Sequence, residues 1–180
     1  MLVHGLLIAY PVLWRHGWGI SDTPMSDRGD RIHPMTQVKT PCIGICSTTS
    51  LGDRICRGCK RFNFEVIRWN TYSNQEKLAV FKRIDLFTEQ ILSSRFHIFS
   101  VERLQDVMND FRYFYHPDLS PYCWLHGLLQ KFGYRIKTLD EIGVQLTPAF
   151  QGRDLGELLL EVNQDLQVLS EAHFERYFQS

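Results

Sequence analysis

The stretch from residue 41 to residue 61, PCIGICSTTSLGDRICRGCKR, holds four of the five cysteines of this chain: Cys42, Cys46, Cys56 and Cys59. Their spacing is C-x3-C-x9-C-x2-C. Two close pairs joined by a short loop allow four thiolates to converge on one point, as a tetrahedral metal centre requires. Thiolates are soft ligands that suit zinc or an iron–sulfur cluster and disfavour calcium and magnesium. The pattern therefore predicts a metal site with these four ligands and leaves open which of the two it holds.

The residues beside the second cysteine pair fit this role. Gly58 lies between Cys56 and Cys59 and allows a tight turn that aims backbone N–H groups at the first thiolate. Four thiolates around one Zn²⁺ carry a net charge of about −2, which nearby cations offset. Three basic residues accompany the pair: Arg57, Lys60 and Arg61.

The composition is that of a globular protein without a strong charge bias. Of the 180 residues, 44% are hydrophobic and 13% are aromatic, which excludes a disordered chain. This length suffices for one core plus a small metal-stabilised module. Lys and Arg number 20, as do Asp and Glu, so the whole chain has no excess charge that would attract a polyanion. Residues 42–69 are mildly basic, whereas residues 138–180 are acidic.

The cysteines also bear on the cellular compartment. Residues 2–14 are apolar, yet they have neither a positively charged leader nor a small-residue cleavage site. This stretch is also too short for a transmembrane helix and contains Pro11. We therefore expect a cytoplasmic protein without membrane association, in which clustered thiols hold a metal rather than form disulfides.

Residues 1–38 are expected to form a poorly structured N-terminal segment. Glycines and prolines interrupt every sustained periodicity there. One interpretation places the natural start at Met25 or Met35 and treats the residues upstream as an extension. The competing interpretation is a membrane-associating segment that carries the apolar residues Leu6, Leu7, Ile8, Trp14 and Trp18.

Helix signals dominate the rest of the chain. The predicted helices begin at a capping box Ser73–Glu76, near Ser100, at Ser120–Pro121, at a second capping box Thr138–Glu141, and at Asp154. The first helix has an apolar face, made of Leu78, Phe81, Ile84, Leu86, Phe87 and Ile91. No strand pattern of comparable strength appears. The predicted fold is therefore all-α, with a small four-cysteine metal-binding knuckle module at residues 39–85 packed on a helical domain at residues 86–180.

A short helix is predicted over residues 62–70, directly after the cysteines. Phe64, Ile67 and Trp69 are expected to cover the metal site and tie it to the helical body. Trp69 lies four residues before the capping serine Ser73, where the short helix should turn into the long one. We therefore predict that its ring is buried between the module and the body.

Four short motifs lie in and directly after the cysteine stretch. They are P-C-x-x-x-C at residues 41–46, C-x-G-C-x-R at residues 56–61, Glu65 and Trp69 in an E-x-x-x-W pattern, and S-x-x-E at residues 73–76. Together they resemble a bacterial domain-of-unknown-function family, number 1289. The resemblance covers about a quarter of the chain, up to roughly residue 85.

This chain departs from that family's pattern at two positions. Val66 stands where isoleucine is usual, and Phe62 stands where a small hydroxyl residue is common. Members of the family are described as predicted iron–sulfur proteins on the basis of their cysteines. The resemblance therefore implies a metal site at the four cysteines and brings no reaction with it.

Three residues outside this stretch could form a second metal set: His116, Cys123 and His126. Because Pro117 and Pro121 interrupt them, we expect a free buried cysteine and two surface or helix-packing histidines instead. The run from His116 to Asp118 is expected to be a turn rather than an acid–base pair. With no Gly-rich phosphate loop, no catalytic residue and no small-molecule substrate to name, we expect a protein that is not an enzyme.

Three functions remain open for the cysteine site. The first is a metal-dependent adaptor that binds another protein and uses the cysteines structurally; the second is an iron–sulfur electron carrier. The third is a nucleic-acid-binding zinc knuckle, because basic residues alternate with aromatic ones here as they do in stacking platforms. The basic residues are Arg54, Arg57, Lys60, Arg61 and Arg68, and the aromatic ones are Phe62, Phe64, Trp69 and Tyr72.

Overall fold

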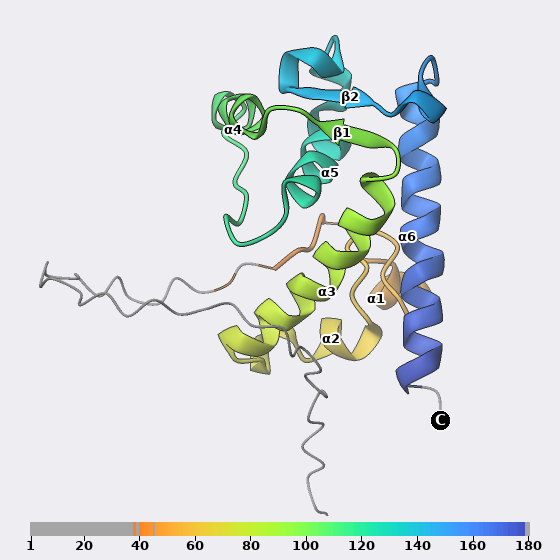
Figure 1. Cartoon of the computed structure of the whole chain (residues 1–180). Coiled ribbons are helices and arrows are strands. Elements are labelled where there is room, and N and C mark those ends of the chain that lie inside the picture. The colour runs from red at the N-terminus through yellow and green to blue at the C-terminus, as the bar shows by residue number, and fades with distance from the viewer. Residues whose placement is uncertain (1–37, 39, 45, 179–180) are drawn as a thin grey trace, which may run out of the picture. The chain divides into compact units, whose positions relative to one another are not determined.

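The computed structural model describes residues 38, 40–44 and 46–178 (Figure 1). The chain divides into two units, Met1–Thr36 and Gln37–Ser180, and the described residues all belong to the second. The expectations for the N-terminal segment, including the alternative starts at Met25 and Met35 and its membrane association, lie outside the described residues.

The second unit is mainly helical, as predicted. Its α-helices are α1 (Ser47–Leu51), α2 (Asn63–Ile67), α3 (Asn74–Leu92), α4 (Val101–Asp110), α5 (Pro121–Phe132) and α6 (Leu155–Phe178). Short 3-10 helices span Trp69–Thr71, Gly133–Arg135, Leu139–Ile142 and Pro148–Phe150. None of the helices in the described part of the chain is both long and apolar enough to cross a bilayer.

A two-stranded antiparallel sheet adds to the helices and was not predicted. Strand β1 (Phe96–Ile98) pairs with β2 (Val144–Leu146), with Phe96 opposite Leu146 and Ile98 opposite Val144. Each strand has three residues, which is too short for an alternating pattern to show in the sequence. The sheet buries Phe96 and Val144 completely, so it closes one end of the helical core.

The predicted helix starts are confirmed where a side chain caps the helix. The Ser73 hydroxyl accepts the Glu76 N–H, and the Glu76 carboxylate accepts the Ser73 N–H at 2.7 Å, which makes a complete capping box at the start of α3. Ser100 and Ser120 cap α4 and α5 with their hydroxyls, and Asp154 accepts the Glu157 N–H at the start of α6. Local sequence therefore fixes these four helix starts.

Two predictions about helices are wrong. Thr138–Glu141 does not open an α-helix; in the described structure Thr138 makes no capping bond and the chain forms only a 3-10 turn, because Gly143 ends it in a left-handed conformation. Leu86 belongs to the predicted apolar face of α3 but is 64% exposed. The buried residues of α3 are instead Lys77, Val80, Thr88, Ile91 and Leu92.

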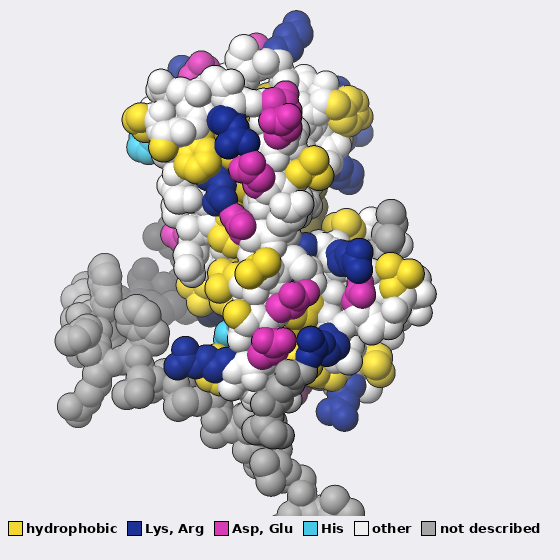
Figure 2. Space-filling view, turned by 90° about the vertical axis from the view of Figure 1, so that its right-hand side faces the viewer, with side chains coloured by type: hydrophobic (Ala, Val, Ile, Leu, Met, Phe, Trp, Pro, Cys, Tyr) yellow, Lys and Arg dark blue, Asp and Glu magenta, His cyan; other side chains and the backbone are white. Residues whose placement is uncertain are grey.

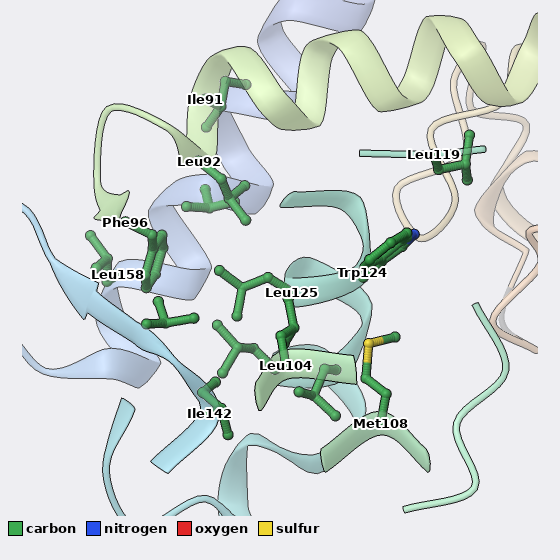
Figure 3. Packing of buried hydrophobic residues seen from close by; sticks show 14 of the residues in the cluster. Ile91, Leu92, Phe96, Leu104, Met108, Leu119, Trp124, Leu125, Ile142 and Leu158 are labelled. Carbon is green, nitrogen blue, oxygen red and sulfur yellow. The ribbon is translucent and has the colours of Figure 1, made fainter. Parts of the chain in front are cut away.

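The helical core lies between α3, α5 and α6, with the sheet and α4 closing it (Figures 1 and 3). Figure 3 shows Leu92 of α3, Leu125 of α5 and Leu158 of α6 pointing into one interior. Its buried members are Ile91, Leu92, Phe96, Leu104, Met108, Leu119, Trp124, Leu125, Leu128, Leu129, Ile142, Val144, Leu158, Val162 and Leu166. Each fully buried Leu contributes about 1.5–3 kcal/mol relative to an exposed one.

A second, smaller cluster joins the cysteine stretch to the last helix. It consists of Ile55, Phe62 and Phe174, with Phe64 and Phe178 partly buried against it. The ring centroids of Phe62 and Phe174 lie 5.1 Å apart in an edge-to-face arrangement. Because α3 runs through residues 85 and 86, one continuous helix belongs to both of the predicted domains.

Candidate metal centre

The second cysteine pair lies in a tight hairpin, residues 55–62. Ile55 pairs with Phe62 across an isolated antiparallel bridge, and the Cys56 N–H donates to the Arg61 carbonyl at 2.8 Å. The Lys60 N–H donates back to the Cys56 carbonyl, also at 2.8 Å. Lys60 has φ 59, so the chain reverses through a left-handed residue directly after Cys59. A non-glycine residue in this conformation costs about 1–2 kcal/mol, which the surrounding contacts offset.

The hairpin points backbone N–H groups at the Cys56 sulfur. Burial raises the pKa of this thiol, but the N–H groups of Cys59, Gly58 and Ser47 donate to it and together lower the pKa to about 6. A sulfur that accepts several N–H bonds is stabilised as the thiolate. Because the thiolate is the form that binds metals, this environment suits Cys56 to the role of a ligand. This confirms the expectation that the turn around Gly58 directs N–H groups at the first thiolate.

Cys59 receives its hydrogen bond from a side chain. Burial raises the pKa of its thiol, and Arg61 opposes that shift by donating from Nε to Sγ at 3.3 Å. The Arg61 guanidinium is buried and stacks over Trp69, 4.7 Å from the ring centroid. Trp69 is 7% exposed and also contacts Phe81 of α3. The predicted burial of Trp69 between module and body is therefore confirmed.

The first cysteine pair approaches the hairpin through α1. Cys46 directly precedes Ser47, whose N–H donates to the Cys56 sulfur and whose hydroxyl accepts the Arg57 N–H at 2.9 Å. Cys42 is half-buried and lines the same cavity as Cys59. The structure thus brings Cys56 and Cys59 together and places the Cys46 segment against them. Among the described residues, no three His, Cys, Asp or Glu side chains gather closely enough to hold a metal ion.

The donor set fits a thiolate-bound metal, although the four sulfurs are not gathered. Cys56 and Cys59 already have the N–H and guanidinium partners that thiolate ligands need. Within the described residues none of the cysteines is in a disulfide. Residues Cys42, Cys46, Cys56 and Cys59 would hold the ion, and a bound zinc or cluster would cross-link the two halves of the cysteine segment.

The basic residues of the segment are mostly engaged within it. Lys60 is 4% exposed, and its ammonium donates to the Arg57 carbonyl; burial lowers its pKa, while the charges of Cys56, Cys59 and Glu171 raise it. Arg57 pairs with Asp53 at 2.8 Å. The cations near the cysteines therefore compensate local negative charge.

A buried ion pair supports the hairpin and was missed in the sequence. Glu65 is 5% exposed; its carboxylate accepts the Phe62 N–H at 2.8 Å and the Arg83 guanidinium at 2.7 Å. Arg83 lies on α3 and stacks over the Phe62 ring, 3.8 Å from its centroid. The resemblance in sequence pointed to Glu65, but nothing in the sequence pointed to Arg83 as its partner.

The covering of the site differs from the prediction. Ile67 was expected to cover the site but is 76% exposed, because the five-residue helix α2 turns that side outward. Phe64 does contribute, since it packs against Phe62 and Phe174. The rest of the cover comes from the last turns of α6, which bring Phe174 and Phe178 onto the hairpin. No pattern in the sequence indicated this contact.

The other proposed candidates keep their structural interpretation. Burial and the Asp85 carboxylate raise the pKa of Cys123 to about 12, so this thiol is a poor nucleophile. Burial and the charge of Lys60 lower the pKa of His126 to about 4, although Asn163 raises it through a hydrogen bond. The Asp118 N–H donates to the His116 ring at 3.3 Å, which closes the predicted turn.

Comparison with known proteins recovers the resemblance. Residues 40–87 match the model of a family described as a protein of unknown function (DUF1289). The matched segment includes all four clustered cysteines, the hairpin, Glu65, Trp69 and the first part of α3 with Arg83. No match was found among curated proteins or among solved structures.

Proposed function

We propose that this protein binds one metal centre through Cys42, Cys46, Cys56 and Cys59, and that the centre has a structural role in a small adaptor that binds another protein. The observation that carries the proposal is the hairpin, in which the N–H groups of Cys59, Gly58 and Ser47 and the guanidinium of Arg61 already donate to thiol sulfurs. Such donors are the usual outer shell of thiolate ligands.

The size of the second cluster supports a structural role for the metal. The hairpin buries few large apolar side chains among the described residues, namely Ile55 and Phe62 with Phe174 of α6. A segment with so small a core gains most of its folding free energy from the metal that it binds. The proposed centre would therefore fix the cysteine segment against α3 and α6.

The alternative of an iron–sulfur electron carrier uses the same four ligands. N–H···S hydrogen bonds such as those to Cys56 also set the reduction potential of iron–sulfur clusters. The two proposals are separated by the identity of the metal. Zinc makes the site structural and colourless, whereas a cluster gives the protein a redox function.

The alternative of nucleic-acid binding has weaker support. Lys60 and Arg61 are buried, and the exposed Arg54 and Arg57 pair with acidic side chains. Of the five cations, Arg68 is the exposed one without an ion pair among the described residues. On the face shown in Figure 2, Lys and Arg side chains alternate with Asp and Glu, and the described residues form no continuous basic patch there. Nucleic-acid binders instead concentrate their cations on one surface.

The test is the metal content of protein purified without oxygen. An absorption band near 400 nm with stoichiometric iron is expected from a cluster, and one equivalent of zinc without colour is expected from the structural site. Cys42→Ser and Cys59→Ser should each release the metal, whereas the matched variant Cys123→Ser should retain it. Full metal content in a variant lacking all four clustered cysteines would refute the assignment.

A further inference from the structure

A cavity of about 620 Å³ lies beside the cysteine segment. Its wall includes residues of α3 and α5, the segment from Tyr113 to His116, and both Cys42 and Cys59. Pockets that hold small organic ligands have volumes of roughly 300–1,000 Å³. The cavity is therefore large enough for a molecule of one or two rings.

Aromatic side chains form much of the wall. Trp124 and Tyr115 lie with ring centroids 4.6 Å apart, and the Trp124 N–H donates to the His116 carbonyl at 2.9 Å. Phe81 adds a third ring from α3 and contacts both Trp69 and His116. These fixed ring faces favour a ligand with a flat apolar body, because ring pairs gain energy beyond simple burial.

A glycine in α5 makes room for one of the lining residues. At Gly127 an added Cβ would lie 2.2 Å from the hydroxyl oxygen of Tyr113. Glycine inside a helix costs about 1 kcal/mol relative to alanine. Alanine would therefore suit the helix better at position 127, but it would leave no room for the Tyr113 hydroxyl. The Tyr113 hydroxyl thus packs against α5 at Gly127, and both residues line the cavity.

The wall has no carboxylate. Among the described residues that line the cavity there are two lysines, two histidines and the thiols of Cys42, Cys59 and Cys123, but neither Asp nor Glu. The Asp85 carboxylate accepts hydrogen bonds from the Ser120 N–H, the Ser120 hydroxyl and the Cys123 thiol. Its oxygens are therefore already hydrogen-bonded within the protein. The Lys60 ammonium is likewise bonded to the Arg57 carbonyl. Lys131 is exposed, lies 5.7 Å from the Tyr113 ring centroid, and has no ion pair within the described part.

We propose that this cavity binds a small organic anion with a flat, ring-containing apolar body. The body would lie against Phe81, Tyr115 and Trp124, and the anionic group would lie at the end formed by Lys131 and the Tyr113 hydroxyl. This site goes beyond the metal centre and needs no metal for its recognition chemistry. The cavity wall at α5 would thus bind an organic ligand, whereas the cysteines would bind the metal.

Two fluorescent probes with nearly the same ring system test the proposal on the full chain. Anilinonaphthalene sulfonate carries the anion, and phenylnaphthylamine lacks it. We expect saturable one-to-one binding of the sulfonate and weaker binding of the neutral amine. Lys131→Gln should weaken sulfonate binding about three- to fivefold at low salt and leave the amine unchanged. The matched variant Lys137→Gln, at an exposed lysine away from the cavity, should change neither.

A filling substitution checks where the probes bind. Ile84→Trp places a larger ring into the cavity wall on α3 and should abolish binding of both probes. If that variant does not fold, Lys131→Gln against Lys137→Gln still decides the case, since both positions are exposed. Equal sulfonate affinities in those two variants, tighter binding of the neutral amine, or undiminished binding in a folded Ile84→Trp protein would each overturn the proposal.

Discussion

The helical core and the hairpin region are held together by different means. The helical core buries fifteen large apolar residues. They lie on α3, α4, α5, α6 and the sheet, except for Leu119 and Ile142, which lie on the connecting segments. The hairpin region, residues 40–72, shares a much smaller cluster with α6 and instead buries charged groups, namely Lys60, Arg61 and Glu65. Buried charges are costly unless each has a partner. The hairpin region therefore depends on specific polar contacts, whereas the helical core depends on the amount of apolar surface that it buries.

Removing the proposed metal is the largest perturbation that separates the two regions. With Cys59→Ser, or with chelator added to the wild type, we expect residues 40–70 to become sensitive to protease while the far-ultraviolet circular dichroism of the helical core persists. The binding free energy of structural zinc sites is roughly 10–16 kcal/mol. Loss of both regions together would show that the helical core depends on the hairpin, and Cys123→Ser should leave both intact.

Trp69→Ala tests the contact through which the regions meet. The ring packs on Phe81 and under Arg61, so we expect the free energy of unfolding in urea to fall by about 3–5 kcal/mol. Tyr134→Ala, at a position 85% exposed, should change it by no more than about 0.5 kcal/mol. A Trp69→Ala protein with wild-type stability and metal content would mean that the two regions are energetically independent.

Arg83→Met tests the buried ion pair. Its loss leaves the Glu65 carboxylate buried without its counter-charge, which should cost about 3 kcal/mol at neutral pH. Burial already raises the pKa of Glu65 and Arg83 lowers it, so the variant should raise this pKa further. A group whose folded-state pKa is raised contributes stability below its unfolded pKa and loses that contribution as pH rises. The destabilisation should therefore shrink on acidification.

The matched control for the ion pair is Arg153→Met. Arg153 pairs with Glu161 at 2.7 Å, but the two side chains are 40% and 42% exposed. Because solvent screens such a pair, we expect the urea unfolding curve of this variant to overlay that of the wild type. If both variants lose the same stability, the buried pair has no special role in the hairpin region.

Ser73→Ala should have the smallest effect of the destabilising changes, because it alters one cap at the start of α3. We expect a loss of about 1 kcal/mol in the free energy of unfolding, similar to that of Ser100→Ala at the start of α4. The Ser73 N–H and hydroxyl lower the pKa of Glu76. A lowered pKa contributes stability at higher pH that is lost as pH falls. The difference in the free energy of unfolding between Ser73→Ala and the wild type should therefore narrow in acid. The corresponding difference for Ser100→Ala should not follow the titration of Glu76.

The parts of the fold that the sequence predicted are those set by near neighbours. Ser73, Ser100 and Pro121 mark helix starts because the groups that satisfy the first turn lie within three or four residues. Trp69 could be assigned to the interior because it lies where the short predicted helix over residues 62–70 turns into the long one. The sheet was missed since its pairing joins segments that are far apart in the chain and only three residues long.

The sequence singled out the candidate ligands but not their surroundings. The cysteine spacing named the four sulfurs that we propose as ligands, but the donors to Cys56 include Ser47, which reaches it only through the fold. The pairing of Glu65 with Arg83 and the cover from Phe174 depend on how α3 and α6 pack. The exposure of Ile67 likewise follows from the direction in which α2 leaves the hairpin. Such contacts have no local signature.

The contact between the hairpin and α6 sets an order of events during synthesis. Arg54 and Glu175, which form one of its ion pairs, are 121 positions apart in the chain. At a translation rate of about 5–20 residues per second, the second partner follows the first by on the order of ten seconds. The hydrogen bonds of the hairpin join residues close together in the chain, so its cysteines are synthesised well before α6 and lack the aromatic cover through that interval. A metal bound as we propose would have that interval to enter before Phe174 and Phe178 close over the hairpin.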